Sequence, residues 1–174
     1  MGRRNESIDF LLECIANSII DLMKYKKFID ITVNEIVNRS GVSRATYFRH
    51  FESKYDILIY RLKTSWSYWC IDNDVEVKDK FDINNAYTFF AFNYQNRDLL
   101  KLLYDNDLTD VILYAFYSVI NEEKESYANA FYNYGMFGIL SQWVKNDFRE
   151  SPEEMAKTGI ELVRLNSKKE NVKR

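Results

Sequence analysis

The chain has little that would interrupt a helix, with one proline and five glycines in 174 residues. Proline lacks the N–H that the helical ladder uses, and glycine loses the most backbone entropy on folding, so their scarcity favours helices. Apolar residues make up 47% of the chain, which is enough to build a sizeable core. We therefore predict an almost entirely α-helical protein.

Several classes of protein need residues that this chain lacks. His50 is the only histidine, and Cys14 and Cys70 stand alone without a CxxC pair, which disfavours histidine triads, metal sites and disulfides. No glycine-rich phosphate loop occurs. No segment approaches the roughly 20 apolar residues of a membrane-spanning helix, and residues 1–10 are polar and charged, unlike a signal peptide. We expect a cytoplasmic protein that is not an enzyme and uses no cofactor, metal or membrane.

The most informative segment is residues 32–58, which read TVNEIVNRSGVSRATYFRHFESKYDIL. Thr32 and Glu35 form a T-x-x-E capping box, which predicts the start of a helix. Gly41 suits the left-handed residue that ends such a helix, and Ser43 is a natural N-cap for the next one. The segment therefore predicts a helix-turn-helix, whose second helix enters the DNA major groove.

The second helix of this motif, expected over residues 44–51, has two distinct faces. Tyr47 and Phe51 are four residues apart and share the face that we place inward. The face left toward solvent or DNA carries Arg44, Ala45, Phe48 and Arg49. Ser53 and Asp56 suggest a further cap, which opens a long helix from residue 54.

This arrangement resembles the TetR/AcrR family of bacterial transcriptional regulators over roughly residues 7–63. The family pattern is close to T-V-x-x-I-A-x-x-A-G-V-S-x-x-T-[FL]-Y-x-[HY]-F-x-[SN]-K. The matching positions are Thr32, Val33, Ile36, Gly41, Val42, Ser43, Thr46, His50, Phe51, Ser53 and Lys54. Phe48 departs from the pattern, because the family usually has a tyrosine there. Phenylalanine lacks the hydroxyl for a phosphate contact but is compatible with a thymine methyl.

The motif and the resemblance together predict a DNA-binding surface for a palindromic operator in double-stranded DNA. We expect Arg44, Ala45 and Phe48 to face base edges, with Arg49 on the same surface. The residues expected to hold phosphates are Thr32, Ser43, Thr46, His50 and Lys54. Residues 1–63 carry 11 Lys or Arg against 8 Asp or Glu, and the rest of the chain has a net negative charge, so the positive charge lies where phosphate must be met.

The predicted fold class is all-α, with an N-terminal three-helix helix-turn-helix domain and a C-terminal helical body for ligand binding and dimerisation. We place the DNA-binding domain at residues 1–53 and the body at residues 54–174. The helices are expected over residues 7–24, 32–40, 44–51, 54–70, 83–96, 97–104, 108–121, 125–146 and 152–166.

Small residues in the last two predicted helices indicate a close helix contact. Gly135 and Gly138 share a face with helical spacing, Trp143 follows on the same helix, and Gly159 lies in the last helix. These residues favour either packing within the chain or an interface between two chains. The TetR resemblance implies the second, since that family pairs its last two helices into a four-helix bundle, and a symmetric operator needs a two-fold protein.

The body is dense in aromatic residues, most of which we expect to be core. The family resemblance implies a ligand cavity, for which the candidates are Trp66, Phe90, Tyr94, Tyr114, Tyr117 and Phe131. Apolar rings with a few hydroxyls suit a flat or amphipathic small molecule, whose identity does not follow. Residues 138–157 also resemble relatives that include the dihydroxyacetone-kinase operon regulators. The predicted function is a DNA-binding repressor released by a small molecule, and the alternative is a co-regulator of the same fold whose effector is a protein partner.

Overall fold

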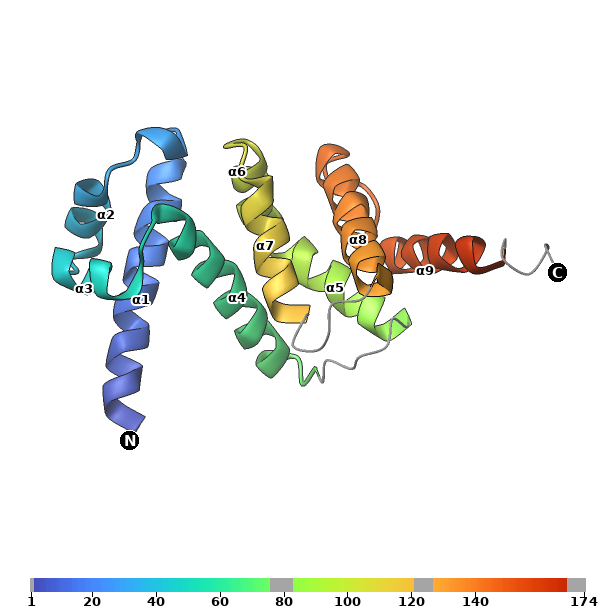
Figure 1. The fold of residues 1–174 in the computed structure, drawn as a ribbon, viewed down its shortest axis with the longest axis horizontal. Helices are drawn as coiled ribbons and strands as arrows, with labels where there is room; N and C mark the ends of the chain where they lie inside the picture. Colours follow the sequence, from blue (N-terminus) through green and yellow to red (C-terminus); the bar gives the residue numbers. More distant parts are fainter. Residues whose placement is uncertain (1, 76–82, 121–126, 169–174) are drawn as a thin grey trace. The chain divides into compact units, whose positions relative to one another are not determined.

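The computed structural model describes residues 2–75, 83–120 and 127–168, and all the regular structure in these ranges is helical (Figure 1). The elements are α1 (Gly2–Met23), the short 3-10 helix η1 (Phe28–Asp30), α2 (Val33–Ser40), α3 (Arg44–His50), α4 (Lys54–Asp72), α5 (Ile83–Gln95), α6 (Arg97–Tyr104), α7 (Thr109–Ile120), α8 (Tyr127–Lys145) and α9 (Pro152–Lys168). The prediction of an all-α fold is confirmed. Among the described helices, none has both the length and the apolar character needed to cross a membrane.

The observed helix bounds agree closely with those expected from the sequence, with one clear difference. The first helix begins at Gly2 rather than at Ser7. The predicted end of the seventh helix at residue 121 and the start of the eighth at residue 125 lie outside the described residues. Ser151 caps α9, because its hydroxyl accepts from the backbone N–H of Glu154 at 3.2 Å.

The chain divides into two compact units, each described here by itself. The first comprises Met1–Ser65 with Leu102–Ile120, and the second comprises Trp66–Lys101 with Asn121–Arg174. The long helix α4 therefore contributes residues to both units, as does α6. The predicted boundary at residue 53 separates a DNA-binding domain from a ligand-binding and dimerisation body by function, whereas these two units are separated by compactness. That functional boundary stays a prediction.

The core of the first unit forms around one face of α1. Leu12, Ile15, Ile19 and Met23 recur at helical spacing on α1 and are all buried. Helix α2 packs on α1 and buries Ile36 against this core. The remaining helices of the unit, with the turn before α7, add further buried apolar side chains, namely Tyr47, Ile57, Leu58, Leu62, Leu103, Leu108, Val111, Ile112 and Ala115.

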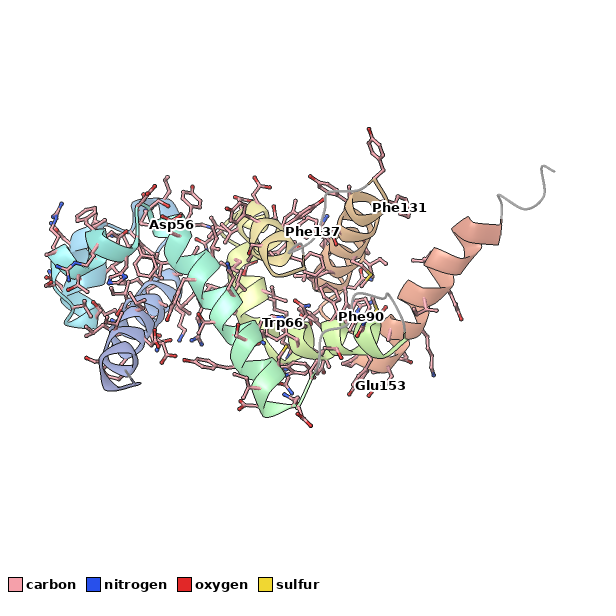
Figure 2. The ribbon with its side chains drawn as sticks, turned by 60° about the horizontal axis from the view of Figure 1, so that its bottom comes forward. Asp56, Trp66, Phe90, Phe131, Phe137 and Glu153 are labelled. Carbon is pink, nitrogen blue, oxygen red and sulfur yellow. The ribbon has the colours of Figure 1, made fainter. Side chains whose placement is uncertain are left out.

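The second unit is organised by the packing of α5 along α9. Phe90 of α5 is fully buried, and Figure 2 shows it beside α9. Gly159 of α9 faces this ring, because a Cβ at that position would lie 3.5 Å from Cε2 of Phe90, in ordinary van der Waals contact. Trp143 of α8 packs edge-on against the same ring, with the centroids 5.5 Å apart.

Candidate nucleic-acid interface

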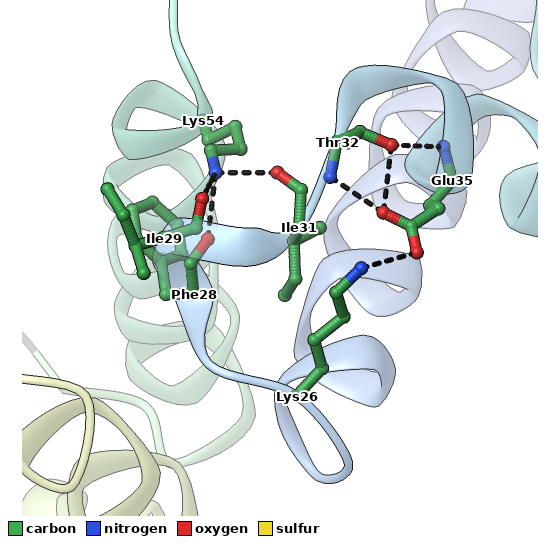
Figure 3. Close-up of polar contacts among 7 residues, drawn as sticks. All are labelled: Lys26, Phe28, Ile29, Ile31, Thr32, Glu35 and Lys54. Atoms are coloured by element: carbon green, nitrogen blue, oxygen red, sulfur yellow. Dashed lines mark hydrogen bonds and ion pairs between the residues drawn. The ribbon is translucent and has the colours of Figure 1, made fainter.

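The predicted capping box is present at the start of α2. The hydroxyl of Thr32 accepts from the backbone N–H of Glu35 at 3.3 Å, and the backbone N–H of Thr32 donates to the Glu35 carboxylate at 2.8 Å (Figure 3). Lys26 also donates to this carboxylate, at 2.7 Å. These bonds, with Lys26 the largest cause, lower the pKa of Glu35 from 4.5 to about 2. The start of α2 is thus held by one carboxylate with several donors.

The turn between α2 and α3 has the geometry that its sequence predicts. Gly41 adopts a φ of +69°, a left-handed conformation in which a side chain is disfavoured. Val42 is buried and anchors the turn in the core. Ser43 caps α3, because its side-chain oxygen accepts from the backbone N–H of Thr46 at 3.1 Å. The helix-turn-helix is therefore formed by local signals that the sequence displays.

The two faces of α3 separate as expected. Tyr47 is 1% exposed and Phe51, at the C-cap, is 4% exposed, so both point into the first unit. The outward residues of the helix are all exposed, namely Arg44, Ala45, Phe48, Arg49 and His50. The predicted phosphate ligands Thr32 and Ser43, which cap α2 and α3, are exposed, and Thr46 in the first turn of α3 is half-buried. Most of the predicted DNA-binding residues thus lie together on and beside the outer face of α3.

Arg44 does not extend freely from this face. Its Nη1 donates to Oδ1 of Asn34 at 2.6 Å, and its guanidinium carbon lies 5.3 Å from the centroid of the Phe48 ring. Asn34 belongs to α2, and sequence reasoning did not single it out. No local pattern points to it, because its partner lies ten residues further along the chain and only the turn brings them together.

Lys54 is placed differently from the other predicted phosphate ligands. Its ammonium donates to the backbone carbonyls of Phe28 at 2.7 Å, Ile29 at 3.3 Å and Ile31 at 2.6 Å (Figure 3). It also lies 4.6 Å from the centroid of the Phe28 ring. Partial burial lowers the pKa of Lys54, and the nearby carboxylates of Asp30 and Glu35 act against this shift. In this conformation all three N–H donors of the ammonium are engaged within the chain.

The segment held by Lys54 is also bonded to the turn between α6 and α7. The backbone N–H of Phe28 donates to Oδ1 of Asn106 at 2.8 Å, and Nζ of Lys27 donates to the carbonyl of Asp105 at 3.0 Å. All of these residues belong to the first unit. The connector that leads into α2 is thus fixed from two sides, by the start of α4 and by the turn after α6.

Tyr47 carries an unusual polar group for a core position. Its hydroxyl is buried, and among the described residues no hydrogen-bond partner reaches it. Burial raises the pKa of this phenol, with a further contribution from the negative charge of Asp56. A buried hydroxyl without a partner costs free energy, so this position favours an aromatic ring without the oxygen.

The six residues predicted to line a ligand cavity have different surroundings. Trp66, Phe90, Tyr94 and Phe131 belong to the second unit, whereas Tyr114 and Tyr117 belong to the first. Phe90 is fully buried, as a core residue is, whereas Trp66 and Tyr94 are half-buried. Trp66 stacks on Trp69, and Tyr94 stacks on Trp143. Tyr114 is 63% exposed and Phe131 is 59% exposed, and Figure 2 shows Phe131 on the outside of α8. Tyr114 and Phe131 therefore do not line the interior of their own units.

The four residues predicted at a dimer interface fall into two pairs. Trp143 is 1% exposed within its own chain, and its indole N–H donates to the carbonyl of Glu150 at 3.2 Å. Gly159 faces Phe90 inside the second unit. The surroundings of these two residues are filled by side chains of the same chain, and their place in or near a dimer interface stays a prediction. Gly135 and Gly138 are exposed, and a Cβ on either would meet no heavy atom within 4 Å.

Comparison with known families agrees with this geometry. Residues 27–60 match the model of the bacterial regulatory proteins of the tetR family, and residues 83–164 match that of a transcriptional regulator C-terminal region of TetR proteins. The two matches together cover about two thirds of the chain. No curated protein matches the chain. Within the described residues, no group of three histidines, cysteines or carboxylates is placed to hold a metal ion. With an exposed second helix in a capped helix-turn-helix and family matches to both parts, the chain belongs to the TetR family of DNA-binding transcriptional regulators.

Proposed function

We propose that the protein is a homodimeric repressor that binds a palindromic operator through α3 and is released by a small molecule bound in the body. The outer face of α3 carries this proposal. Arg44, Phe48 and Arg49 are exposed there, while the opposite face buries Tyr47 and Phe51. Two exposed arginines can donate hydrogen bonds to bases or phosphates, and the exposed aromatic ring beside them can make apolar contacts in the major groove.

The outer residues have two kinds of role in this proposal. Arg44, Ala45 and Phe48 face base edges and set specificity, while phosphate contacts set affinity for every sequence. The phosphate ligands are Thr32, Ser43, Thr46, Arg49 and His50. Lys54 is left out of this set, because its ammonium already holds three carbonyls. We assign it instead to fixing the connector before α2.

The dimer in this proposal forms through α8 and α9. Gly135 and Gly138 leave an open strip on α8, and exposed aromatic side chains flank it at Phe131 and Tyr134. An exposed apolar strip with small residues suits close approach of a second helix. Two copies related by a two-fold axis present their recognition helices to half-sites roughly 34–36 Å apart.

Release from DNA follows if a ligand favours a different arrangement of the body. Two features link the body to the helix-turn-helix, namely the continuous helix α4 and the bonds of the connector to Asp105 and Asn106. A ligand shifts the equilibrium only by its difference in affinity for the two arrangements. A change of a few ångströms in half-site spacing, small beside roughly 34 Å, then lowers affinity without unfolding either unit.

A second candidate is a co-regulator whose effector is a protein partner. The exposure of Tyr114 and Phe131 favours it, because these two rings, which were predicted to line a cavity, are exposed on their own units. Under either candidate, we further propose that the protein is related to the dihydroxyacetone-kinase operon regulators. We also propose that it is cytoplasmic and is not an enzyme.

Operator selection from a random double-stranded library, followed by gel shifts at several salt concentrations, tests the function. We expect a palindromic sequence to emerge and its affinity to fall steeply with salt, as released counterions require. A protein that selects no sequence from the library contradicts the repressor. Tryptophan fluorescence with a metabolite panel, followed by gel shifts with each hit, then separates a small-molecule effector from a protein partner.

A further inference from the structure

Arg44 occupies a position that helix stability does not explain. It is the first residue of α3, where the helix dipole is least favourable to a cation, and no acidic residue lies in the first turn of that helix. The side chain is exposed, as is the Phe48 ring beneath it, which is 52% exposed. An exposed cation on an exposed aromatic ring at the start of a recognition helix points to a role outside the chain.

The guanidinium is fixed from two directions. Asn34, the second residue of α2, accepts a hydrogen bond from Nη1 of Arg44 at 2.6 Å. Phe48 lies one helical turn further along α3, and the centroid of its ring is 5.3 Å from the guanidinium carbon. The donors on Nε and Nη2 bond to none of the residues that the structure describes. The contact to Asn34 therefore leaves a complete edge of the guanidinium, Nε and Nη2, with two parallel donors.

We propose that Asn34 and Phe48 are positioning residues that hold Arg44 ready to read a guanine. The free edge of the guanidinium matches O6 and N7 of guanine in the major groove, and a bidentate contact of this kind needs both donors in one plane. A free arginine must lose rotamer entropy to make such a contact, and a side chain already held by an amide and a ring loses less of it. Phe48 thus lies on the face turned to the bases and sets specificity by orienting the Arg44 guanidinium, not through a separate contact to a thymine methyl. This inference rests on the proposed sequence-specific binding of DNA.

The alternative is that Asn34 and Arg44 merely tether α2 to α3. A tether affects the stability of the motif and its affinity for all DNA, but not the preference for one base over another. Base preference at a single position is therefore the readout that separates the two roles.

The experiment uses the full chain and the operator that the wild type selects, together with single base-pair variants of that operator. Arg44→Ala identifies the guanine, because discrimination at that base pair falls by about 5- to 150-fold. Asn34→Ala and Phe48→Leu are expected to lower discrimination several-fold at this same base pair and at no other. Phe48→Tyr keeps the ring and is expected to keep the discrimination.

Two further variants separate positioning from other effects. Asn34→Asp retains an acceptor for the guanidinium, so it is expected to preserve base preference while its added negative charge weakens binding to all sequences. Asn38→Ala makes the same change one turn further along α2, at an exposed asparagine, and is expected to leave this base preference unchanged. In the free protein, NMR of the Arg44 Nε–H group is expected to show greater mobility in Asn34→Ala than in the wild type.

Three results overturn the inference. Equal weakening of all operator variants by Asn34→Ala and Phe48→Leu would leave only the tether. A loss of base preference in Asn34→Asp as full as in Asn34→Ala would make the amide itself the reader. Wild-type discrimination by Arg44→Ala would remove Arg44 from base reading while the proposed function stands. A wild type that selects no operator contradicts the proposed function, and this inference falls with it.

Discussion

Replacing Lys54 by methionine distinguishes a connector clamp from a phosphate ligand. Methionine keeps an unbranched apolar chain beside Phe28 but removes the ammonium that holds the carbonyls of Phe28, Ile29 and Ile31. The bonds of 2.6 and 2.7 Å are partly buried, whereas the bond of 3.3 Å is exposed. The loss therefore falls mainly on two charge-assisted hydrogen bonds.

The expected size of the effect follows from these two bonds. A hydrogen bond to a charged group contributes about 1.5–3 kcal/mol in a protein, and the exposed third bond adds little. The partial burial that lowers the pKa of Lys54 offsets part of this gain, and water can reach the freed carbonyls, so we expect a net loss of about 2 kcal/mol. For a chain of 174 residues this corresponds to a fall in Tm of about 4–8 °C.

Thermal unfolding followed by circular dichroism measures the fall in Tm, and gel shifts over a range of salt concentrations measure phosphate contacts. A clamp predicts a lower Tm with an unchanged dependence of log Kd on log salt. A phosphate ligand predicts an unchanged Tm with a slope reduced in magnitude by about 0.9. Lys157→Met, at an exposed position of α9, controls for loss of a lysine. An unchanged Tm with a flatter salt slope would refute the clamp and restore Lys54 to the phosphate set.

Three further predictions concern single side chains. Tyr47→Phe removes a buried hydroxyl without a partner, so urea unfolding should show a gain of up to about 1 kcal/mol, and a loss would mean that the hydroxyl is bonded. Because folding lowers the pKa of Glu35, the contribution of this carboxylate to stability is present above pH 4.5 and is lost as the pH falls toward 2. The difference in Tm between the wild type and Glu35→Gln should therefore vanish over that range. A difference in Tm that stays constant with pH would exclude the ionised carboxylate as its source. A leucine at position 138 would meet open space within a single chain, so Gly138→Leu should leave Tm unchanged yet raise the monomer fraction in sedimentation. Gly159→Leu should instead lower the free energy of unfolding by about 1–3 kcal/mol, because the new side chain meets Phe90. A Gly138→Leu protein as dimeric as the wild type would remove this strip of α8 from the interface.

The helices and their caps could be predicted from the sequence, because both depend on residues three or four positions apart. Thr32 with Glu35, Ser43 with Thr46 and the left-handed Gly41 all have the predicted geometry. The inward placing of Tyr47 and Phe51 follows from helical spacing alone and is also confirmed. Local backbone chemistry is strong enough here that no distant contact changes the outcome.

The partner that each long or bulky side chain contacts could not be predicted in this way, because it depends on how the helices pack. Lys54 reaches carbonyls more than 20 residues away, and Arg44 meets Asn34 across a turn, so neither contact appears in any short pattern. Glycine spacing likewise made Gly138 and Gly159 equal candidates for an interface, yet one is open and the other touches Phe90. A sequence pattern predicts which residues share one face of a helix, but the neighbour that covers that face comes from elsewhere in the chain. Packing therefore has to be known before an interior contact can be told from a surface that DNA or a second copy could contact.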